Sequence, residues 1–551
     1  MWWKEATAYQ VYPRSFMDAS GDGIGDLKGV TSKLDYLKDL GIDLIWISPF
    51  YKSPNDDYGY DISDYQDIMD EFGTMADFDE LLAEAHKRGI KVIGDLVINH
   101  SSDEHPWFIE SRSSFDNPKR DWYIWRDPRN GEEPNNWESI FRGSAWEYDE
   151  ATKQYYMHLF SKKQPDLNWE NPVVRQELYK MINWWLDKGL DGFRIDAISH
   201  IKKEDGFPDM PNPENMEFVS SFDKHMNVDG IQPFLQELKE ETFAKYDVVT
   251  VGEANGVSID GALEWVGAEK GKFNMIFQFE HVHLWRESIA EKNIAGLKEV
   301  LTRWQDGLEG MGWNALYIEN HDLARAVSTL GDQVNYWKES AKSLAVMYFF
   351  MKGTPFIYQG QEIGMTNCYF ETIEEYGDLH SVSNYRELLK QGKPVDEALE
   401  IIRATTRGNS RTPMQWDDTD FGGFSTSDTW IGMNPNYSQI NVNQQLADPD
   451  SILNFYKAMI QLRKSDELYI HGVYELIAPD HPAVYAYTRT LDDKKAVIVA
   501  NLTGESQEVS LDGLQVESKK MKLANYDVSE HDLLGILQLR PFEARIYEVR
   551  G

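Results

Sequence analysis

The chain has 551 residues, 41% apolar and 27% charged, so it is long enough for several hydrophobic cores and its composition is not that of a disordered protein. Acidic residues outnumber basic ones by 92 to 55, and the formal net charge of −37 argues against nucleic acid or an anionic membrane as a partner. The single cysteine, Cys368, excludes an internal disulfide and any multi-cysteine metal site. With no signal-peptide pattern and no apolar run long enough to span a bilayer, the sequence predicts a soluble, cytoplasmic protein.

An early stretch, "DASGDGIGD", has oxygen-bearing groups at alternate positions, as in a calcium-binding loop. These candidate ligands are Asp18, Ser20, Asp22, the carbonyl of Ile24, and Asp26. The twelfth position of the loop is Gly29 rather than glutamate, which argues against a full EF-hand. A solvated turn rich in aspartate and glycine is the alternative.

Eight β-rich runs alternate with helix-patterned segments over the first two-thirds of the chain. In chain order they are "AYQVY" (8–12), "DLIWIS" (43–48), "KVIGDLVI" (91–98), "GFRID" (192–196), "VVTVGE" (248–253), "NMIFQF" (274–279), "NALYIE" (314–319) and "TPFIYQG" (354–360). Between the second and third runs, apolar residues from Phe78 to Ala85 recur at helical spacing before Gly89 ends the pattern. Alternating strands and helices favour a parallel sheet, and eight repeats predict a closed (β/α)₈ TIM barrel of the α/β class.

Two stretches interrupt the alternation, and the end of the chain changes character. Residues 101–168 are rich in Trp, Pro, Asn and Asp and predict an inserted subdomain after strand three, while a long loop, "DGFPDMPNPENMEF", follows strand four. From about residue 470, short alternating runs such as "AVYAYTRTL" are typical of an antiparallel β domain. The predicted domains are therefore a barrel (1–100 and 169–470), the inserted subdomain (101–168) and a C-terminal β-sandwich (471–551).

Polar residues follow several of the predicted strands at the end where a barrel carries its active site. The set comprises Asp95 and His100 after strand three, Arg194 and Asp196 in strand four, Glu253 after strand five, and Asn320, His321 and Asp322 after strand seven. Any one acid in such a place could equally be a helix cap. Independent helix capping poorly explains why so many polar residues lie at the same end of the predicted barrel.

Two of these acids suit glycoside hydrolysis, which needs one carboxylate to attack and a second to protonate the departing oxygen. Arg194 and Asp196 share one face of their strand, and the arginine favours the charged form of the aspartate, which makes Asp196 a candidate nucleophile. A structural ion pair is the alternative at that position. Glu253 follows the apolar run "VVTVG", which suits a carboxyl held partly neutral. We find no Walker-type phosphate loop, no HExxH and no G-x-S-x-G elbow.

The segments "DLVINH", "GFRIDAIS", "VGEAN" and "ENHD", in this order and each at its expected strand, resemble the four signature regions of the α-amylase family of glycoside hydrolases, family 13. The stretch "QPDLNWEN" (164–171) resembles the hallmark of the oligo-1,6-glucosidase and α-glucosidase subfamily. The similarity runs from "VYPRSF" through "RTPMQW" and so covers nearly the whole chain.

The resemblance implies a retaining mechanism with three catalytic acids: Asp196 as nucleophile, Glu253 as general acid and base, and Asp322 as stabiliser of the distorted sugar. It implies substrate contacts from Asp57, Tyr60, His100, Phe141, Phe160, Arg194, Ala197, Asn255, His321 and Arg407. Asp57 and Arg407 would close the pocket, so that only a chain end enters and single glucose units are released. One structural Ca²⁺ or Mg²⁺ in the early aspartate loop is also implied, although Ser20 replaces a better ligand, and no organic cofactor is expected.

The linkage is predicted from the residue after the nucleophile. Subfamily members that prefer α-1,6 bonds usually resemble one another in carrying valine there, whereas this chain has Ala197, followed after strand five by Asn255 in "EANG". We therefore expect maltose and short α-1,4-linked oligosaccharides as substrates, with oligo-1,6-glucosidase as the alternative. Trehalose 6-phosphate is a further alternative that needs an anion site, for which Lys202 and Lys203 are the nearest candidates, although a solvated helix start explains both.

A non-catalytic sugar-binding relative is the distant alternative, since such relatives typically lose one of the acids and this chain keeps all three. The expected partners are small oligosaccharides, without nucleic acid or membrane, and the expected assembly is a monomer or homodimer.

Overall fold

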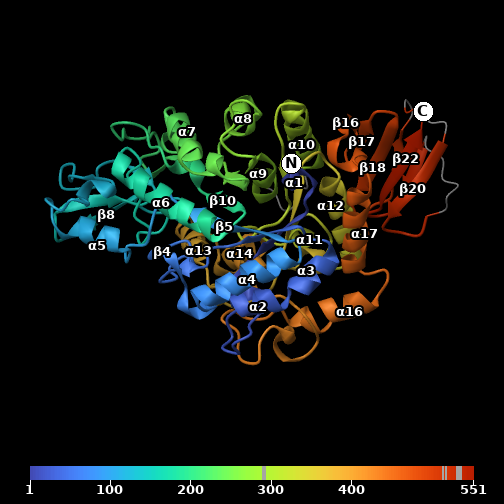
Figure 1. Cartoon of the computed structure of the whole chain (residues 1–551), viewed down its shortest axis with the longest axis horizontal. Helices are drawn as coiled ribbons and strands as arrows, with labels where there is room; N and C mark the ends of the chain where they lie inside the picture. Colours follow the sequence, from blue (N-terminus) through green and yellow to red (C-terminus); the bar gives the residue numbers. More distant parts are fainter. Residues whose placement is uncertain (288–292, 512–513, 515–517, 529–535, 551) are drawn as a thin grey trace.

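Eight parallel strands form the central sheet of the computed structural model, which describes residues 1–287, 293–511, 514, 518–528 and 536–550. Their spatial order is β13-β12-β10-β5-β2-β1-β15-β14, and β13 and β14 at the two ends contact each other, so the sheet is a nearly closed barrel (Figure 1). The strands are β1 (Ala8–Val11), β2 (Leu44–Ile47), β5 (Lys91–Val97), β10 (Gly192–Asp196), β12 (Val249–Glu253), β13 (Met275–Phe277), β14 (Ala315–Leu316) and β15 (Thr354–Tyr358). Each lies within one of the eight runs expected from the sequence, which confirms the predicted barrel.

The register of strand β10 places its charged residues inside the barrel. Arg194 is paired with Asp95 of β5 on one side and with Val251 of β12 on the other. The intervening Phe193 and Ile195 are fully buried in the main hydrophobic core. Because successive side chains of a strand face opposite ways, burying these two apolar residues outward directs Arg194 and Asp196 inward.

Helices cover the outside of the barrel (Figure 1). The principal ones are α2 (Leu27–Ser32), α3 (Leu34–Leu40), α4 (Met75–Lys87), α6 (Pro172–Lys188), α7 (Ile231–Glu241), α8 (Ile259–Val266), α9 (Glu280–Glu287), α10 (Ile294–Leu308), α12 (Trp337–Phe349) and α17 (Ile452–Ser465). Their ends follow local rules: the Thr74 side chain caps α4 in a capping box with Asp77, and α6 ends at Gly189 with a left-handed φ of 113°.

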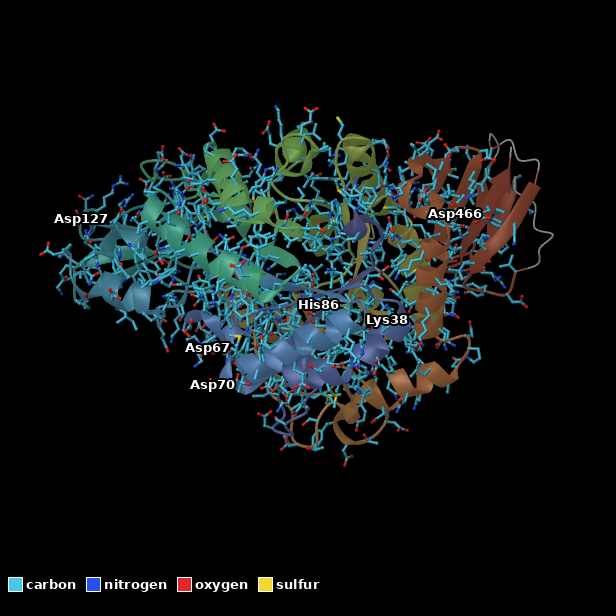
Figure 2. All side chains as sticks on the ribbon, in the orientation of Figure 1. Lys38, Asp67, Asp70, His86, Asp127 and Asp466 are labelled. Carbon is cyan, nitrogen blue, oxygen red and sulfur yellow. The ribbon has the colours of Figure 1, made fainter. Side chains whose placement is uncertain are left out.

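The segment after β5 forms a small subdomain at the left of Figure 1. It contains α5 (Pro106–Ser113), β6 (Trp125–Arg126), β7 (Trp137–Glu138), β8 (Trp146–Asp149) and β9 (Gln154–Met157), with Trp137 and Trp146 in a core of their own. Asp127 marks its outer end in Figure 2. The long loop after β10 joins this subdomain, because its strand β11 (Val219–Ser220) pairs with β7 and the indole of Trp137 donates to the carbonyl of Pro208.

The chain ends in an antiparallel β domain at the right of Figure 1, as predicted. One sheet has the order β16-β17-β18-β22-β20 and a second pairs β19 with β21. These strands are β16 (Val473–Ile477), β17 (Val484–Leu491), β18 (Lys494–Asn501), β19 (Gln507–Ser510), β20 (Ser518–Ala524), β21 (Ile536–Leu539) and β22 (Ala544–Arg550). The domain packs on α12 and α17, with Asp466 beside it in Figure 2. Within the described residues, no helix has the length and apolar character needed to cross a membrane.

Candidate active site

A cavity of about 700 Å³ opens at the carboxyl ends of the barrel strands. Its lining contains eleven of the residues predicted from the sequence: Asp57, Tyr60, His100, Phe141, Phe160, Asp196, Ala197, Glu253, Asn255, Asp322 and Arg407. Arg194 and His321 are buried just behind this lining and bond to residues that form it. The structure therefore brings the whole predicted set, apart from the aspartate loop, to one site.

Arg194 connects three carboxylates at the bottom of this cavity. One terminal nitrogen, Nη1, donates to Asp95 Oδ1 at 2.7 Å and to Asp196 Oδ1 at 2.8 Å, and the other, Nη2, lies 2.8 Å from Glu253 Oε2. The side chain of Arg194 is 3% exposed, so these contacts are shielded from solvent. A single guanidinium thus fixes the spacing and orientation of both candidate reacting carboxyls.

The turn after Asp196 is backbone-strained. Ala197 adopts a left-handed conformation with φ 44° and ψ 30°, and its N–H donates to Glu253 Oε2 at 2.8 Å. A non-glycine residue in this region costs free energy and persists where the surroundings enforce it. Here the turn ties the strand of Asp196 directly to Glu253.

Burial and the crowding of acids shift the protonation of this cluster. Burial raises the pKa of Asp196, Arg194 opposes the shift, and the charges of Glu253 and Asp95 add to it. Burial likewise raises the pKa of Asp95 to about 6 against the pull of Arg194. The arginine favours ionisation of Asp196, as predicted from the sequence, but desolvation outweighs it. Asp95 and Asp196 consequently retain a proton to a higher pH than isolated carboxyls do.

Arg407 joins the opposite walls of the cavity. Its Nη2 donates to Asp57 Oδ1 at 2.8 Å, its Nη1 to Asp322 Oδ1 at 3.0 Å and its Nε to Asp378 Oδ1 at 2.6 Å. Arg411 adds a second bond to Asp322 Oδ1 at 3.0 Å. Burial opposes the charge of Asp322, but the guanidinium groups of Arg407 and Arg411 hold the pKa of its carboxyl well below its usual range. Asp322 is therefore firmly ionised.

Two buried histidines flank the cavity and are neutral at physiological pH. Burial lowers the pKa of His100 to about 4 and that of His321 to about 3. The ring of His321 is stacked on Tyr60 at 5.2 Å between centroids, and its Nε2 lies 2.7 Å from the tyrosine hydroxyl. Tyr60 in turn donates to Asp95 Oδ2 at 3.0 Å. The tyrosine ring is thus held as a fixed wall, and His321 lies behind it.

Aromatic side chains and a helical hairpin form the mouth. Phe141 and Phe160 come from the inserted subdomain and contact each other edge to face at 5.7 Å. Facing them are residues of α13 (Leu379–Lys390) and α14 (Val395–Thr405), including His380, whose ring lies 5.4 Å from Phe141. The hairpin follows β15 and was not anticipated from the sequence. A flat apolar wall with polar groups at its edges suits a sugar ring.

Sequence reasoning missed several supporting residues. Gln164 donates to Asp57 Oδ2 at 3.2 Å and contacts His100, while Asp378 holds the Nε of Arg407. Gln164 and Arg411 lie in the motifs "QPDLNWEN" and "RTPMQW", which could have indicated them. No local pattern marks Asp378.

The two lysines after β10 are not a solvated helix start, contrary to the expectation. Lys203 is buried and its Nζ lies 2.7 Å from Asp166 Oδ2, and Lys202 is 2.6 Å from both Glu170 and Asp205. Both ammonium groups form ion pairs, and neither lysine lines the cavity.

The early aspartate loop is closed by hydrogen bonds. Asp18 accepts from the N–H groups of Gly21 and Gly23, and Asp26 caps α2 and accepts from Ala19, Ser20 and Gly29. In the described part of the chain, no three His, Cys, Asp or Glu side chains are grouped closely enough to hold a metal ion. The oxygen-rich donors suit a hard cation in chemistry, but in this conformation the carboxylates do not converge.

Comparisons with known proteins agree with this geometry. A family model of the alpha-amylase catalytic domain matches residues 10–472, and a model of the alpha-amylase SusG C-terminal domain matches residues 484–546. The probable oligo-1,6-glucosidase 3 of Bacillus subtilis strain 168 is 56% identical, with 99% of each chain covered. The oligo-1,6-glucosidase of Parageobacillus thermoglucosidasius is 52% identical over 100% of this chain and 99% of that protein. Among solved structures, the trehalose-6-phosphate hydrolase of Bacillus licheniformis superposes with a TM-score of 0.92 at 43% identity, covering both chains completely.

Proposed function

Because the chain belongs to the α-amylase family of glycoside hydrolases, we propose that it is an exo-acting, retaining glucosidase that removes terminal glucose from short α-1,6-linked oligosaccharides. Asp196 is the nucleophile in this proposal, and Glu253 is the acid and base. The observation that carries it is the single guanidinium of Arg194 shared by these two carboxylates.

The first chemical step forms a covalent glucosyl-enzyme. Arg194 engages Oδ1 of Asp196, which leaves Oδ2 to attack the anomeric carbon while Glu253 gives its proton to the departing glycosidic oxygen. In the second step Glu253 takes a proton from water, the resulting hydroxyl bonds to the anomeric carbon, and Asp196 leaves as a carboxylate. Retaining enzymes need carboxyls roughly 5–5.5 Å apart, closer than the roughly 6.5–9.5 Å of inverting ones. Two carboxylates bonded to one guanidinium favour the closer arrangement.

The exo mode follows from the bridge made by Arg407. This residue joins Asp57 and Asp322 across the cavity, so the pocket is closed beyond the glucose that would lie against Tyr60. A closed end admits the non-reducing terminus of a chain and excludes a continuing polysaccharide. Asp322 is held ionised where positive charge develops on the sugar ring, which supports its role as transition-state stabiliser.

The linkage proposed here, α-1,6, differs from the α-1,4 linkage expected from Ala197. Maltose was favoured on that residue, but the relatives reported above are named oligo-1,6-glucosidases and support the alternative. Hydrolysis of maltose is the second candidate, because Ala197 lines the cavity in a left-handed turn that a β-branched valine would adopt only at a cost. Asn255 supports a contact to the leaving sugar in either case, since its buried Oδ1 has no hydrogen-bond partner among the described residues.

Initial rates of glucose release from isomaltose, maltose and trehalose 6-phosphate test the proposal. We expect isomaltose to be cut fastest and all activity to be lost in Asp196→Asn. Faster maltose than isomaltose would overturn the linkage while leaving the glucosidase assignment. Full activity of Asp196→Asn would overturn the mechanism. Trehalose 6-phosphate should be poor, because Lys202 and Lys203 are already ion-paired.

For the early loop we propose a structural Ca²⁺ or Mg²⁺ held by Asp18, Ser20, Asp22, the Ile24 carbonyl and Asp26, which must give up some of the internal hydrogen bonds. Such an ion would brace the turn before α2 and take no part in the reaction. Titration calorimetry with CaCl₂ on protein treated with EDTA, compared with Asp22→Asn, tests this. A monomer or homodimer in the cytoplasm with small oligosaccharides as its substrates completes the proposal.

A further inference from the structure

A second cavity of about 340 Å³ lies at the opposite end of the barrel from the catalytic residues. It is lined by segments that directly precede the strands β1, β13, β14 and β15, including Lys4, Asn274, Trp313 and Lys352. Figure 1 shows the helix α1 (Trp2–Glu5) near α8 and α10, and the last residue of α8 and the turn after α10 contribute to the lining. Because family active sites sit at the carboxyl ends of barrel strands, this cavity is separate from the glucosidase site.

The cavity is cationic in a strongly acidic protein. Four lysines line it, Lys4, Lys239, Lys272 and Lys352, and no described residue of the lining is Asp or Glu, although the chain carries 92 acidic residues against 55 basic ones. Burial lowers the pKa of His471, which also lines the cavity, so this residue adds no charge at neutral pH. Lys272 and Lys352 are paired from behind with Glu264 and Glu309. Such a local excess of positive charge runs against the composition of the chain.

Two of the lysines are left without a carboxylate in the described part of the chain. Lys239 donates to the carbonyl of Gly271 at 2.7 Å, and Lys4 lies 4.6 Å from the ring centre of Trp313. Burial lowers the pKa of Lys4, and the nearby charge of Lys352 adds to that shift. An anion bound beside Lys4 would favour its charged form and offset the repulsion from Lys352.

Buried guanidinium groups behind the wall add to the positive charge. Arg463 donates to the carbonyl of Lys4, and Arg489 donates to the carbonyls of Ile470 and Gly472, which flank His471. Both arginines bond only to backbone carbonyls within the described residues. The nearby carboxylates of Asp43, Glu5 and Glu309 offset part of these two charges, and the remaining positive charge strengthens the attraction for an anion in the cavity.

We propose that this cavity binds a small sugar phosphate, with its phosphoryl group between Lys4 and Lys239. A phosphoryl group alone fills a small part of the volume, which lies near the lower end of the roughly 300–1,000 Å³ range of small-molecule sites. Trp3, Phe273 and Trp313 supply an apolar wall for the carbon ring. The ligand would act away from the catalytic acids.

Titration calorimetry on the full-length protein tests the site with glucose 6-phosphate, inorganic phosphate and glucose as probes. The informative variant is Lys4→Gln with Lys239→Gln, and the matched control is Lys245→Gln, an exposed lysine just after α7 that is paired with Glu241. We expect sub-millimolar binding of glucose 6-phosphate, weaker binding of phosphate and none of glucose at this site. Since hydrogen bonds to charged groups are among the stronger ones, the double variant should raise the Kd by about tenfold or more.

The control and the thermal melting temperature distinguish loss of the site from loss of the fold. Lys245→Gln should bind as the wild type does, and the double variant should keep its melting temperature and its kcat on isomaltose. The proposal would be overturned if glucose 6-phosphate does not bind, or if the double variant binds it as tightly as the wild type does. It would also be overturned if Lys245→Gln weakens binding as much as the double variant does. Phosphate binding as tightly as glucose 6-phosphate would overturn recognition of the sugar. Added salt should weaken true binding, because the attraction is electrostatic.

Discussion

Replacing Arg407 by lysine tests the closure of the active-site pocket. Three nitrogens of Arg407 bond three different carboxylates, those of Asp57, Asp322 and Asp378, at 2.6–3.0 Å. A lysine keeps the positive charge but has one ammonium group, which cannot span the same three positions. At about 1.5–3 kcal/mol for each hydrogen bond to a charged group, losing two of the three costs about 3–6 kcal/mol.

Only part of that loss should appear in catalysis. Asp322 keeps its bond to Arg411, and the Asp378 bond contributes to folding rather than to the transition state. We expect kcat/KM for isomaltose to fall about 10²–10³-fold in Arg407→Lys, equivalent to about 3–4 kcal/mol. Initial-rate kinetics measure the loss in catalysis, and a thermal melt of the same sample measures the loss in folding stability.

The matched control is Arg142→Lys, on the rim of the same cavity. Arg142 is half exposed, makes long contacts to Glu138 and donates to Asn384 Oδ1 at 3.2 Å without touching a catalytic acid, so its replacement should change kcat/KM by less than about twofold. A double-mutant cycle of Arg407→Lys with Asp57→Asn should be strongly non-additive, because both changes break the same bridge. If Arg407→Lys keeps kcat/KM within about threefold of the wild type, the bridge does not set catalysis and the reasoning fails.

Three further predictions concern the nucleophile, its turn and the buried histidines. Asp196→Asn should fold with an unchanged melting temperature and lose at least about 10³-fold in kcat, since an amide cannot attack the anomeric carbon; stopped assays with isomaltose measure this. Ala197→Val should lose about 1–3 kcal/mol of stability at φ 44° and shift the ratio of isomaltose to maltose rates, and an unchanged ratio would show that this residue does not set the linkage. The free energy of unfolding should fall as the pH drops from about 6.5 towards 4, by about 1.4 kcal/mol per histidine per pH unit. The reason is that these histidines take up protons in the unfolded chain but remain neutral when buried in the folded protein. Melting temperatures at pH 7 and pH 5 check it, and equal values would contradict it. Burial lowers the pKa of the seven residues concerned, which are His100, His105, His158, His200, His225, His281 and His321. Acids whose pKa burial raises, such as Asp61, Asp95 and Asp196, act in the opposite sense and reduce the net fall in stability.

The barrel could be predicted because its strands are buried on both faces and so read as nearly continuous apolar runs. Strand β10 was delimited to the residue, since Gly192 and Asp196 bound a run in which only Arg194 is charged. The same runs brought Asp196, Glu253 and Asp322 to one rim, since the ends of barrel strands converge.

What the sequence did not disclose depends on loops. Asp378 reaches Arg407 from a segment whose place is set by the packing of α13 and α14, and nothing local to it signals that contact. Desolvation of Asp196 also arises from the assembled walls of the cavity, so the pairing with Arg194 gave the wrong sense of its pKa shift. For the linkage, Ala197 favoured α-1,4 bonds, whereas the relatives reported above are named oligo-1,6-glucosidases.

The pairing of β11 with β7 makes the inserted subdomain and the loop after β10 a single folding unit, although more than 80 residues separate Trp137 from Val219. The Trp137 indole, which donates to Pro208, would lose its partner if either segment were replaced alone. A chimaera that transplants residues 101–168 from a relative therefore needs that relative's 205–224 as well. The two segments have to be inherited together, and specificity carried by the mouth of the pocket can be moved between relatives only as this pair.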